Sequence, residues 1–195
     1  HFATFLLFFP KITAGPVERA HHFLPQLKQV IPFNPGNISI GLKLIVLGLF
    51  KKLVIADRLS IYVGAVLGNA EQHSAVTLMV AMIFYVFQMY ADFSGYTDMA
   101  LGLAKILGFD LTQNFNRPLL AKSVTEFWRK WHISLTTWFA DYFYNPIAIA
   151  KRDWGKWSVV YASFTTFVVL GFWHGANWTF IIFGLLQGLI LTIEF

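Results

Sequence analysis

The sequence predicts an all-α, polytopic membrane protein, and three observations support this fold class. Of the 195 residues, 56% are hydrophobic and only 13% are charged, and the mean hydropathy is +0.57. This is more apolar surface than a soluble domain of this size carries. The basic residues flank the apolar segments, as at Lys51–Lys52 and Lys151–Arg152, which is the arrangement expected at the ends of membrane helices. The lipid bilayer is therefore an expected partner of the chain.

Charge and composition exclude other classes. The net charge of +5 is divided among separate groups and does not form the basic stripe of nucleic-acid-binding proteins, so we expect no nucleic-acid partner. The lack of cysteine excludes a disulfide framework, a thiolate metal site and a cysteine nucleophile within the chain. The chain begins at His1 inside an apolar stretch and stops after a hydrophobic run. We expect residues 1–195 to form a single membrane-embedded region that is a fragment of a longer protein.

The N-terminal third predicts short elements. An apolar segment at 2–9 is closed by Pro10. His21 and His22 are adjacent and would point in different directions on a helix, so we interpret them as loop histidines and expect no metal site. Residues 38–50 predict a helix of thirteen residues, which is short for a membrane span and favours a re-entrant or interfacial position.

Residues 74–90 form the clearest candidate for a membrane span, and they lead directly into two acids, Asp92 and Asp98. An acid in or beside a membrane helix usually faces the interior of the bundle. Two interpretations remain open for these acids. In the first, they pair with a basic residue or cap a helix; in the second, they contact the substrate or the donor. Residues 99–109 predict a short helix that Gly108 ends.

A capping box at Ser123 to Glu126 predicts the start of another helix. Its apolar stripe includes Trp131 and His132 at helical spacing. His132 therefore points into lipid or protein and is not expected at a polar surface.

A second histidine, His174, lies between two apolar runs at 159–172 and 180–193. The first run would reach only roughly 21 Å as a helix, against a hydrocarbon core of about 30 Å. If the two runs form a hairpin, its turn lies below the membrane surface, where protein or a water-filled cavity must line it. We therefore expect His174 at the bottom of a cavity.

Six motifs, in this order along the chain, resemble the membrane-bound O-acyltransferase (MBOAT) family. The two most specific contain the histidines, Glu-Phe-Trp-Arg-Lys-Trp-His at 126–132 and Gly-Phe-Trp-His-Gly-Ala-Asn-Trp at 171–178. The other four lie at 14–26, 51–58, 90–98 and 114–118. The similarity is closest to the bacterial branch with alginate O-acetyltransferases and D-alanyl transferases of teichoic acid. It implies a multi-helix bundle around a central tunnel, with the acyl donor arriving from the cytoplasmic side.

The resemblance also implies catalytic roles, with His174 as the essential histidine and His132 as the second active-site position. Close relatives commonly have Arg where this chain has Ala140, and often His where it has Gln187. These departures affect groups that could bind donor, lipid headgroup or substrate. They leave the two central positions intact.

The chemistry is consistent with a histidine base. Acyl transfer from a thioester to an alcohol needs a base for the hydroxyl proton, and imidazole can accept it near neutral pH. Burial would favour the neutral form of His174. Direct transfer is the simpler route, although Ser94 or Ser134 stays open as a nucleophile. We assign Trp173 and Trp178 as walls that exclude water. The remaining expected substrate-binding or donor-binding residues are Asn177, Trp131, Asp92, Asp98 and Asn116.

The predicted function is transfer of a short acyl group, acetyl in the first instance, to hydroxyls of a cell-surface or exported polysaccharide. The donor would be a thioester, acetyl-CoA or an acyl carrier, with no bound cofactor. The protein would be a multi-pass protein of the inner (plasma) membrane and would work with a periplasmic acyltransferase partner. Two alternatives remain: acyl or D-alanyl transfer to a teichoic-acid-like polymer, and a non-catalytic transporter or scaffold. A transporter would predict internal repeats, and none is found in the sequence.

Overall fold

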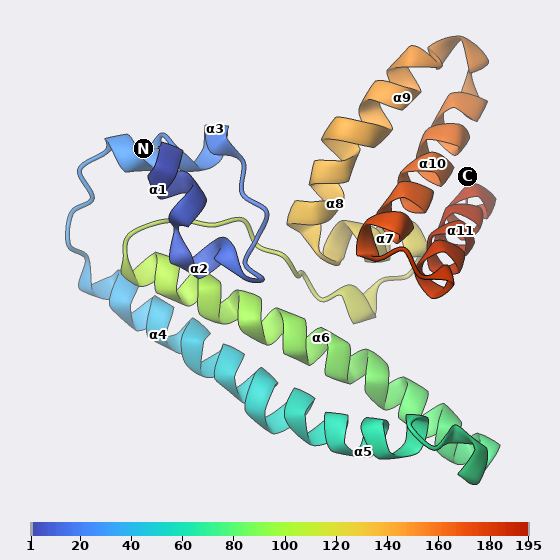
Figure 1. Cartoon of the computed structure of the whole chain (residues 1–195). Helices are drawn as coiled ribbons and strands as arrows, with labels where there is room; N and C mark the ends of the chain where they lie inside the picture. The colour runs from blue at the N-terminus through green and yellow to red at the C-terminus, as the bar shows by residue number, and fades with distance from the viewer. Residues whose placement is uncertain (1, 195) are drawn as a thin grey trace. The chain divides into compact units, whose positions relative to one another are not determined.

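The computed structural model describes residues 2–194, and every regular element in that part of the chain is a helix (Figure 1). The predicted all-α class is therefore confirmed. The chain divides into two compact units, His1–Gln113 and Asn114–Phe195, and each is described by itself.

The first unit opens with short helices packed around one phenylalanine. They are α1 (Phe2–Leu7), α2 (Phe9–Ile12), α3 (Ala20–Phe23) and the 3-10 turn η1 (Gln26–Lys28). Phe23 is fully buried, and its ring stacks on Phe109 at a centroid distance of 5.4 Å. Phe8 and Ala104 complete this cluster. The N-terminal segment is therefore packed against the end of a helix and the loop that lie about eighty residues further along the chain.

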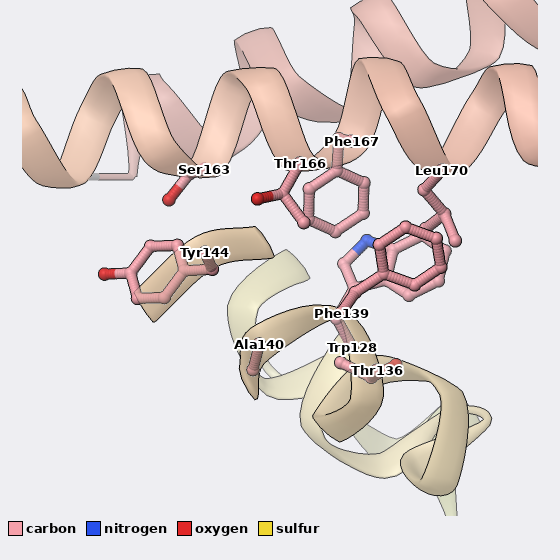
Figure 2. Close-up of a pocket in the computed structure, with 9 residues that line it drawn as sticks. All are labelled: Trp128, Thr136, Phe139, Ala140, Tyr144, Ser163, Thr166, Phe167 and Leu170. Carbon is pink, nitrogen blue, oxygen red and sulfur yellow. The ribbon is translucent and has the colours of Figure 1, made fainter. Parts of the chain in front are cut away.

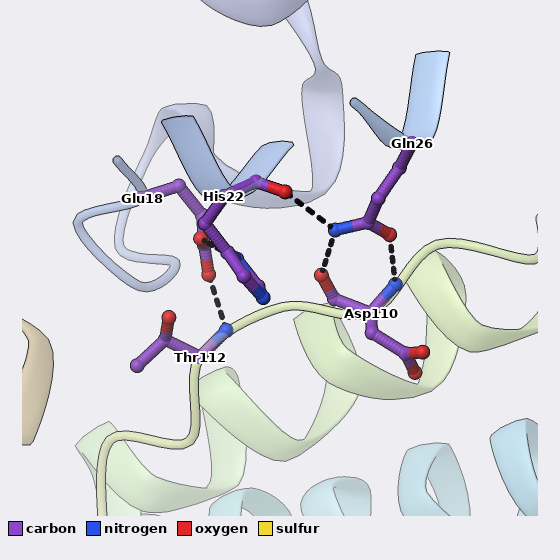
Figure 3. Close-up of polar contacts among 5 residues, drawn as sticks. All are labelled: Glu18, His22, Gln26, Asp110 and Thr112. Carbon is purple, nitrogen blue, oxygen red and sulfur yellow. Dashed lines mark hydrogen bonds and ion pairs between the residues drawn. The ribbon is translucent and has the colours of Figure 1, made fainter. Parts of the chain in front are cut away.

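Polar contacts fasten the same segment to that loop (Figure 3). The buried carboxylate of Glu18 accepts the backbone N–H of Thr112 and lies 2.8 Å from Nδ1 of His22. Gln26 makes two hydrogen bonds with the backbone of Asp110. Its Oε1 accepts the N–H of Asp110 at 2.8 Å, and its Nε2 donates to the carbonyl of Asp110 at 2.9 Å. His22 thus contacts a carboxylate, and residues 2–194 contain no group of three metal-ligating side chains.

A long helical path follows, made of α4 (Pro35–Leu49), the π-helix η2 (Phe50–Ala56) and α5 (Asp57–Leu67). Asn34 caps its start by accepting the N–H of Gly36 at 2.9 Å. The expected thirteen-residue helix at 38–50 is therefore wrong in length, because a π-helical segment carries the path past the lysine pair instead of ending it. The argument for a re-entrant or interfacial helix rested on that short length and no longer holds.

The helix α6 (Ala75–Ile106) has 32 residues and follows the short turn η3 (Ala70–Gln72). At 1.5 Å per residue it is about 48 Å long, which exceeds the hydrocarbon core. Within the described residues it is the one helix long and apolar enough to cross a membrane. The expected span at 74–90 and the expected short helix at 99–109 are thus parts of one continuous helix. Gly108, at φ +83°, ends α6 as predicted, because its N–H and that of Phe109 bond back to the last turn.

Paired glycines allow α4 and α6 to approach closely, and the two helices lie side by side in Figure 1. A Cβ on Gly41 would lie 2.5 Å from the carbonyl oxygen of Gly102, and one on Gly48 would lie 2.4 Å from that of Gly95. Small residues of this kind mark close helix crossings in membrane proteins.

The second unit contains the histidine motifs. Its elements are η4 (Pro118–Leu120), α7 (Val124–Lys130), α8 (Ile133–Phe139), the π-helix η5 (Ala140–Tyr144), α9 (Asn145–Ala150), η6 (Arg152–Trp154), α10 (Lys156–His174) and α11 (Trp178–Ile193). The predicted hairpin is present, with a turn at 175–177 between α10 and α11. Gly171 and Gly184 face each other where the helices cross. However, α10 starts at Lys156 and is longer than the apolar run from which its length was predicted.

Glu194, which follows α11, caps the start of α7. The carboxylate of Glu194 accepts the N–H groups of Val124 at 2.7 Å and Thr125 at 2.9 Å. The indole of Trp128 donates to Oε1 of Gln187 at 3.1 Å. The side chains of Gln187 and Glu194 therefore connect α7 to α11 and to the residue that follows it.

Candidate active site

The helix predicted to run through both Trp131 and His132 is broken at these residues. The predicted cap is present, since Ser123 accepts the N–H of Glu126 at 3.0 Å, but α7 ends at Lys130 and α8 begins at Ile133. His132 has φ 45° and ψ 51°, the left-handed conformation. This conformation costs a residue other than glycine about 1–2 kcal/mol. Surrounding contacts must therefore hold it in place.

Residues 114–116, which we call the clasp, supply these contacts. The carbonyl of Asn114 accepts the N–H of Ile133 at 2.9 Å, and the N–H of Asn116 donates to the carbonyl of Lys130 at 3.0 Å. Oδ1 of Asn114 accepts the N–H of Ser134 at 3.2 Å and its hydroxyl at 2.5 Å. The break is therefore bonded to the clasp on both sides. Asn114 was not among the predicted site residues, and the polar pattern Asn-Phe-Asn just before the capping box is the sequence signal that could have identified it.

His132 is half-buried. Burial, and secondly the charge of His174, lower its pKa to about 4. The imidazole is therefore neutral near pH 7.

His174 is the last residue of α10, and its ring lies between two aromatic rings. The ring of Trp173 meets it edge-on at a centroid distance of 5.0 Å, and the ring of Phe180 stacks on it at 6.1 Å. The chain then turns through Gly175, at φ +157°, where a Cβ would lie 2.9 Å from the ring of Phe180. His174 itself is exposed. The expectation that it lies at the bottom of a cavity is therefore wrong for this part of the chain.

Two other predicted residues follow His174. Asn177 caps α11, since its Oδ1 accepts the N–H of Thr179 at 3.2 Å. Trp178 begins α11 and is 76% exposed, while Trp173 is 58% exposed. The exposed tryptophans and the histidine thus gather at one end of the hairpin.

Trp131 and Asn116 lie at the break. The ring of Trp131 stacks on Phe127 at 5.4 Å and meets Phe115 edge-on at 5.0 Å. The side chain of Asn116 is exposed, and its backbone belongs to the clasp. Trp131 therefore packs on the aromatic residues that flank His132.

Asp92 and Asp98 lie on α6 in the first unit, and both pair with lysines of η2. Nζ of Lys51 is 2.6 Å from Asp98, and Nζ of Lys52 is 2.7 Å from Asp92. Hydrogen bonds to Asp57 and Asp92 raise the pKa of Lys52 to about 12. The pairing interpretation of these acids accounts for the contacts seen.

A cavity of about 140 Å³ lies in the second unit (Figure 2). Thr136, which donates its N–H to the carbonyl of His132, and Leu170, one turn before His174, both line it. In Figure 2, Ser163, Thr166 and Phe167 of α10 face the cavity across from Ala140 and Tyr144. Its other lining residues are Trp128 and Phe139. The cavity therefore begins within one helical turn of each histidine.

Comparison with known proteins gives consistent results. The model of the family described as MBOAT, membrane-bound O-acyltransferase family, matches residues 1–195. A peptidoglycan O-acetyltransferase of Helicobacter pylori is 39% identical over 99% of the chain, and a probable alginate O-acetylase AlgI of Pseudomonas aeruginosa is 37% identical over 99%. A teichoic acid D-alanyltransferase of Bacillus subtilis is 29% identical over 96%. The chain spans 37%, 36% and 49% of the length of these relatives, respectively.

Proposed function

The chain belongs to the membrane-bound O-acyltransferase family, and from this membership we propose that it transfers a short acyl group from a thioester to hydroxyls of a cell-surface or exported polysaccharide. The similarity to enzymes named for peptidoglycan and alginate O-acetylation supports an acetyl group. Transfer of D-alanine to a teichoic-acid-like polymer is the second candidate. It is supported by the similarity to a teichoic acid D-alanyltransferase, which is 29% identical.

The observation that carries the proposal is that the second unit holds both histidines, His132 at the break between α7 and α8 and His174 at the end of α10. They come from different motifs of the sequence. In the proposed mechanism, His174 accepts the proton of the acceptor hydroxyl as its oxygen attacks the thioester carbonyl. The neutral imidazole of His132 orients the substrate or shares the proton. The C–S bond of the thioester breaks, and the leaving thiolate takes the proton from His174, which becomes neutral again.

The same unit supports direct transfer without an enzyme-bound acyl intermediate. The hydroxyl of Ser134 already donates to Asn114 at 2.5 Å, which argues against its use as a nucleophile. Trp173 and Trp178, exposed beside His174, would contact the substrate and limit hydrolysis by water. Asn177 and Trp131 would serve this site mainly by fixing the backbone around each histidine.

The cavity lined by Thr136 and Leu170 supports a short acyl group. An apolar cavity of roughly 150 Å³ holds a ligand the size of benzene, and this one measures about 140 Å³. An acetyl group fits such a volume. Ala140 lines the cavity, so the departure from the family pattern at this position leaves space there.

The family is membrane-bound, and α6 is long enough to span a bilayer. We place the protein in the inner (plasma) membrane as a multi-pass protein that receives acetyl-CoA or an acyl carrier from the cytoplasm. Delivery of the acyl group to an exported polymer would then involve a periplasmic acyltransferase partner. In this arrangement Asp92 and Asp98 act through their lysine pairs, and Asn116 through the clasp.

The test is acyl transfer by membranes of cells that express the protein natively, with wild type compared with His174→Ala. An absent general base should lower transfer by about 10²-fold or more, while the amount of protein in the membrane stays constant. Mass spectrometry of surface polysaccharides identifies the acyl group and the acceptor. Unchanged transfer by His174→Ala would refute the proposal.

A further inference from the structure

Helix α8 is capped in an unusual way. His132 occupies the N-cap position, but its side chain makes no capping hydrogen bond. N-cap residues are usually Ser, Thr, Asp or Asn, whose side chains accept N–H groups of the first turn. At α8 these acceptors come from Asn114, eighteen positions earlier in the chain, through its carbonyl to Ile133 and its Oδ1 to Ser134. The helix is therefore capped while the imidazole is not used for capping.

The backbone supports the same interpretation. The two residues other than glycine with positive φ within residues 2–194 are Arg117 and His132, one directly after the clasp and one between its two bonded partners. Left-handed residues persist where the surrounding structure over-determines them, and they cluster at functional sites. The conformation of His132 is thus fixed by contacts to a distant segment.

Asn114 is placed to provide this restraint. Its side chain is fully buried, and its Oδ1 has two hydrogen-bond donors, both from Ser134. Its Nδ2 is also buried and makes no hydrogen bond to the described residues. An unsatisfied buried amide costs free energy, so fold stability alone is a poor reason for an amide at this position. The acceptor oxygen is the part of the side chain that contacts α8.

We propose that Asn114 is a positioning residue, which holds His132 in its left-handed turn and so sets the direction of the imidazole for acyl transfer. This proposal rests on the proposed function. Asn114 does not contact the reacting groups and acts through His132 alone. Its loss should lower the rate of the chemical step and leave substrate binding unchanged.

The experiment is a double-mutant cycle in native membranes, with Asn114→Ala, His132→Ala and the combined variant. We expect Asn114→Ala to lower kcat by about 10²-fold, the scale for a misplaced catalytic group, with KM changed less than about twofold. In the His132→Ala background, Asn114→Ala should cost little more, because residues that act through one group are non-additive. Asn114→Asp keeps the acceptor oxygen and should recover most of the rate. The matched control is Asn145→Ala, an exposed asparagine at the start of α9.

Two results would overturn the proposal, an unchanged kcat in Asn114→Ala or an equal loss with and without His132. If Asn114→Ala fails to accumulate in membranes, Ser134→Ala serves instead. It removes one of the two bonds to Oδ1 and should lower kcat by a smaller factor, again only when His132 is present. Unchanged kcat in Ser134→Ala would then refute the positioning role. Inactive His174→Ala beside fully active Asn114→Ala would refute only this inference, whereas active His174→Ala would refute the proposed function.

Discussion

His132 lies in a left-handed turn that the clasp holds by backbone and side-chain hydrogen bonds, whereas His174 ends a regular helix and has an exposed ring between two aromatic side chains. The first is fixed by residues far away in the sequence, the second by its immediate neighbours. This difference suggests a division of roles. In the proposed mechanism the clasped histidine would define a direction, and the exposed one would be accessible to substrates.

The largest expected effect comes from substitutions at position 132, which separate the contribution of the imidazole from that of the left-handed backbone. His132→Gly removes the imidazole and relieves the left-handed backbone, while His132→Ala removes the imidazole only. Both should lower transfer by about 10²-fold or more. The glycine variant should nevertheless be more stable than the alanine variant by about 1 kcal/mol, measured by thermal unfolding.

Arg117→Gly is the matched control, because it relieves the other left-handed residue and keeps both histidines. It should retain transfer. Equal stability of His132→Gly and His132→Ala would show that the turn stores no strain.

The second prediction concerns pH and sharpens the contrast in burial. Burial, with the charge of His174 as the second cause, lowers the pKa of His132 from its ordinary 6.5 to about 4. The unfolded chain therefore binds a proton at this histidine between pH 6.5 and 4 while the folded chain does not. Stability from this group is fully present above about pH 6.5 and is lost as the pH falls toward 4. The total loss is about 3 kcal/mol.

Thermal unfolding between pH 4 and pH 7 measures this effect. His132→Gln should flatten the dependence. The interpretation fails if wild type and His132→Gln lose stability in parallel.

The smallest expected effect tests how α7, and with it the clasped side of the site, is held. Gln187→Leu leaves the buried indole N–H of Trp128 without its acceptor, which should cost about 1–2 kcal/mol of unfolding free energy. Gln187→His restores an acceptor and should recover part of this loss in thermal unfolding. A leucine variant as stable as wild type would mean that the hydrogen bond contributes nothing.

Local signals in the sequence were sufficient for some features of the fold. Apolar runs and caps predicted the all-α class, the start of α7 at Ser123 and the end of α6 at Gly108, because these depend on residues within one turn. The break at His132 was missed, since the apolar stripe of tryptophans continues through it and its cause is Asn114. The length of the α4 to α5 path was missed because a π-helix leaves no clear periodic signal.

The candidate site was predictable as a pair of motifs but not as a geometry. Sequence similarity predicts His132 and His174 as site residues, and it could not indicate that the chain turns between α7 and α8, from Lys130 to Ile133. The pairing of Asp92 and Asp98 with lysines was one of two open interpretations, because the partners lie forty or more residues earlier. Both the turn at His132 and the lysine pairs of the two acids depend on hydrogen bonds or ion pairs between segments that are distant in the sequence.

The carboxylate of Glu194 gives the assembly of this unit an order in time. The first N–H groups of α7 obtain their acceptors only after synthesis has passed residue 194, about seventy residues after α7 itself is made. Until then a nascent chain carries a seven-residue helix that Ser123 caps but whose first two N–H groups lack this acceptor, and so short a helix is marginal by itself. The cap on α7 thus forms only after both histidines have been synthesised, and a ribosome that stalls before this glutamate releases a polypeptide with both histidines but without this cap.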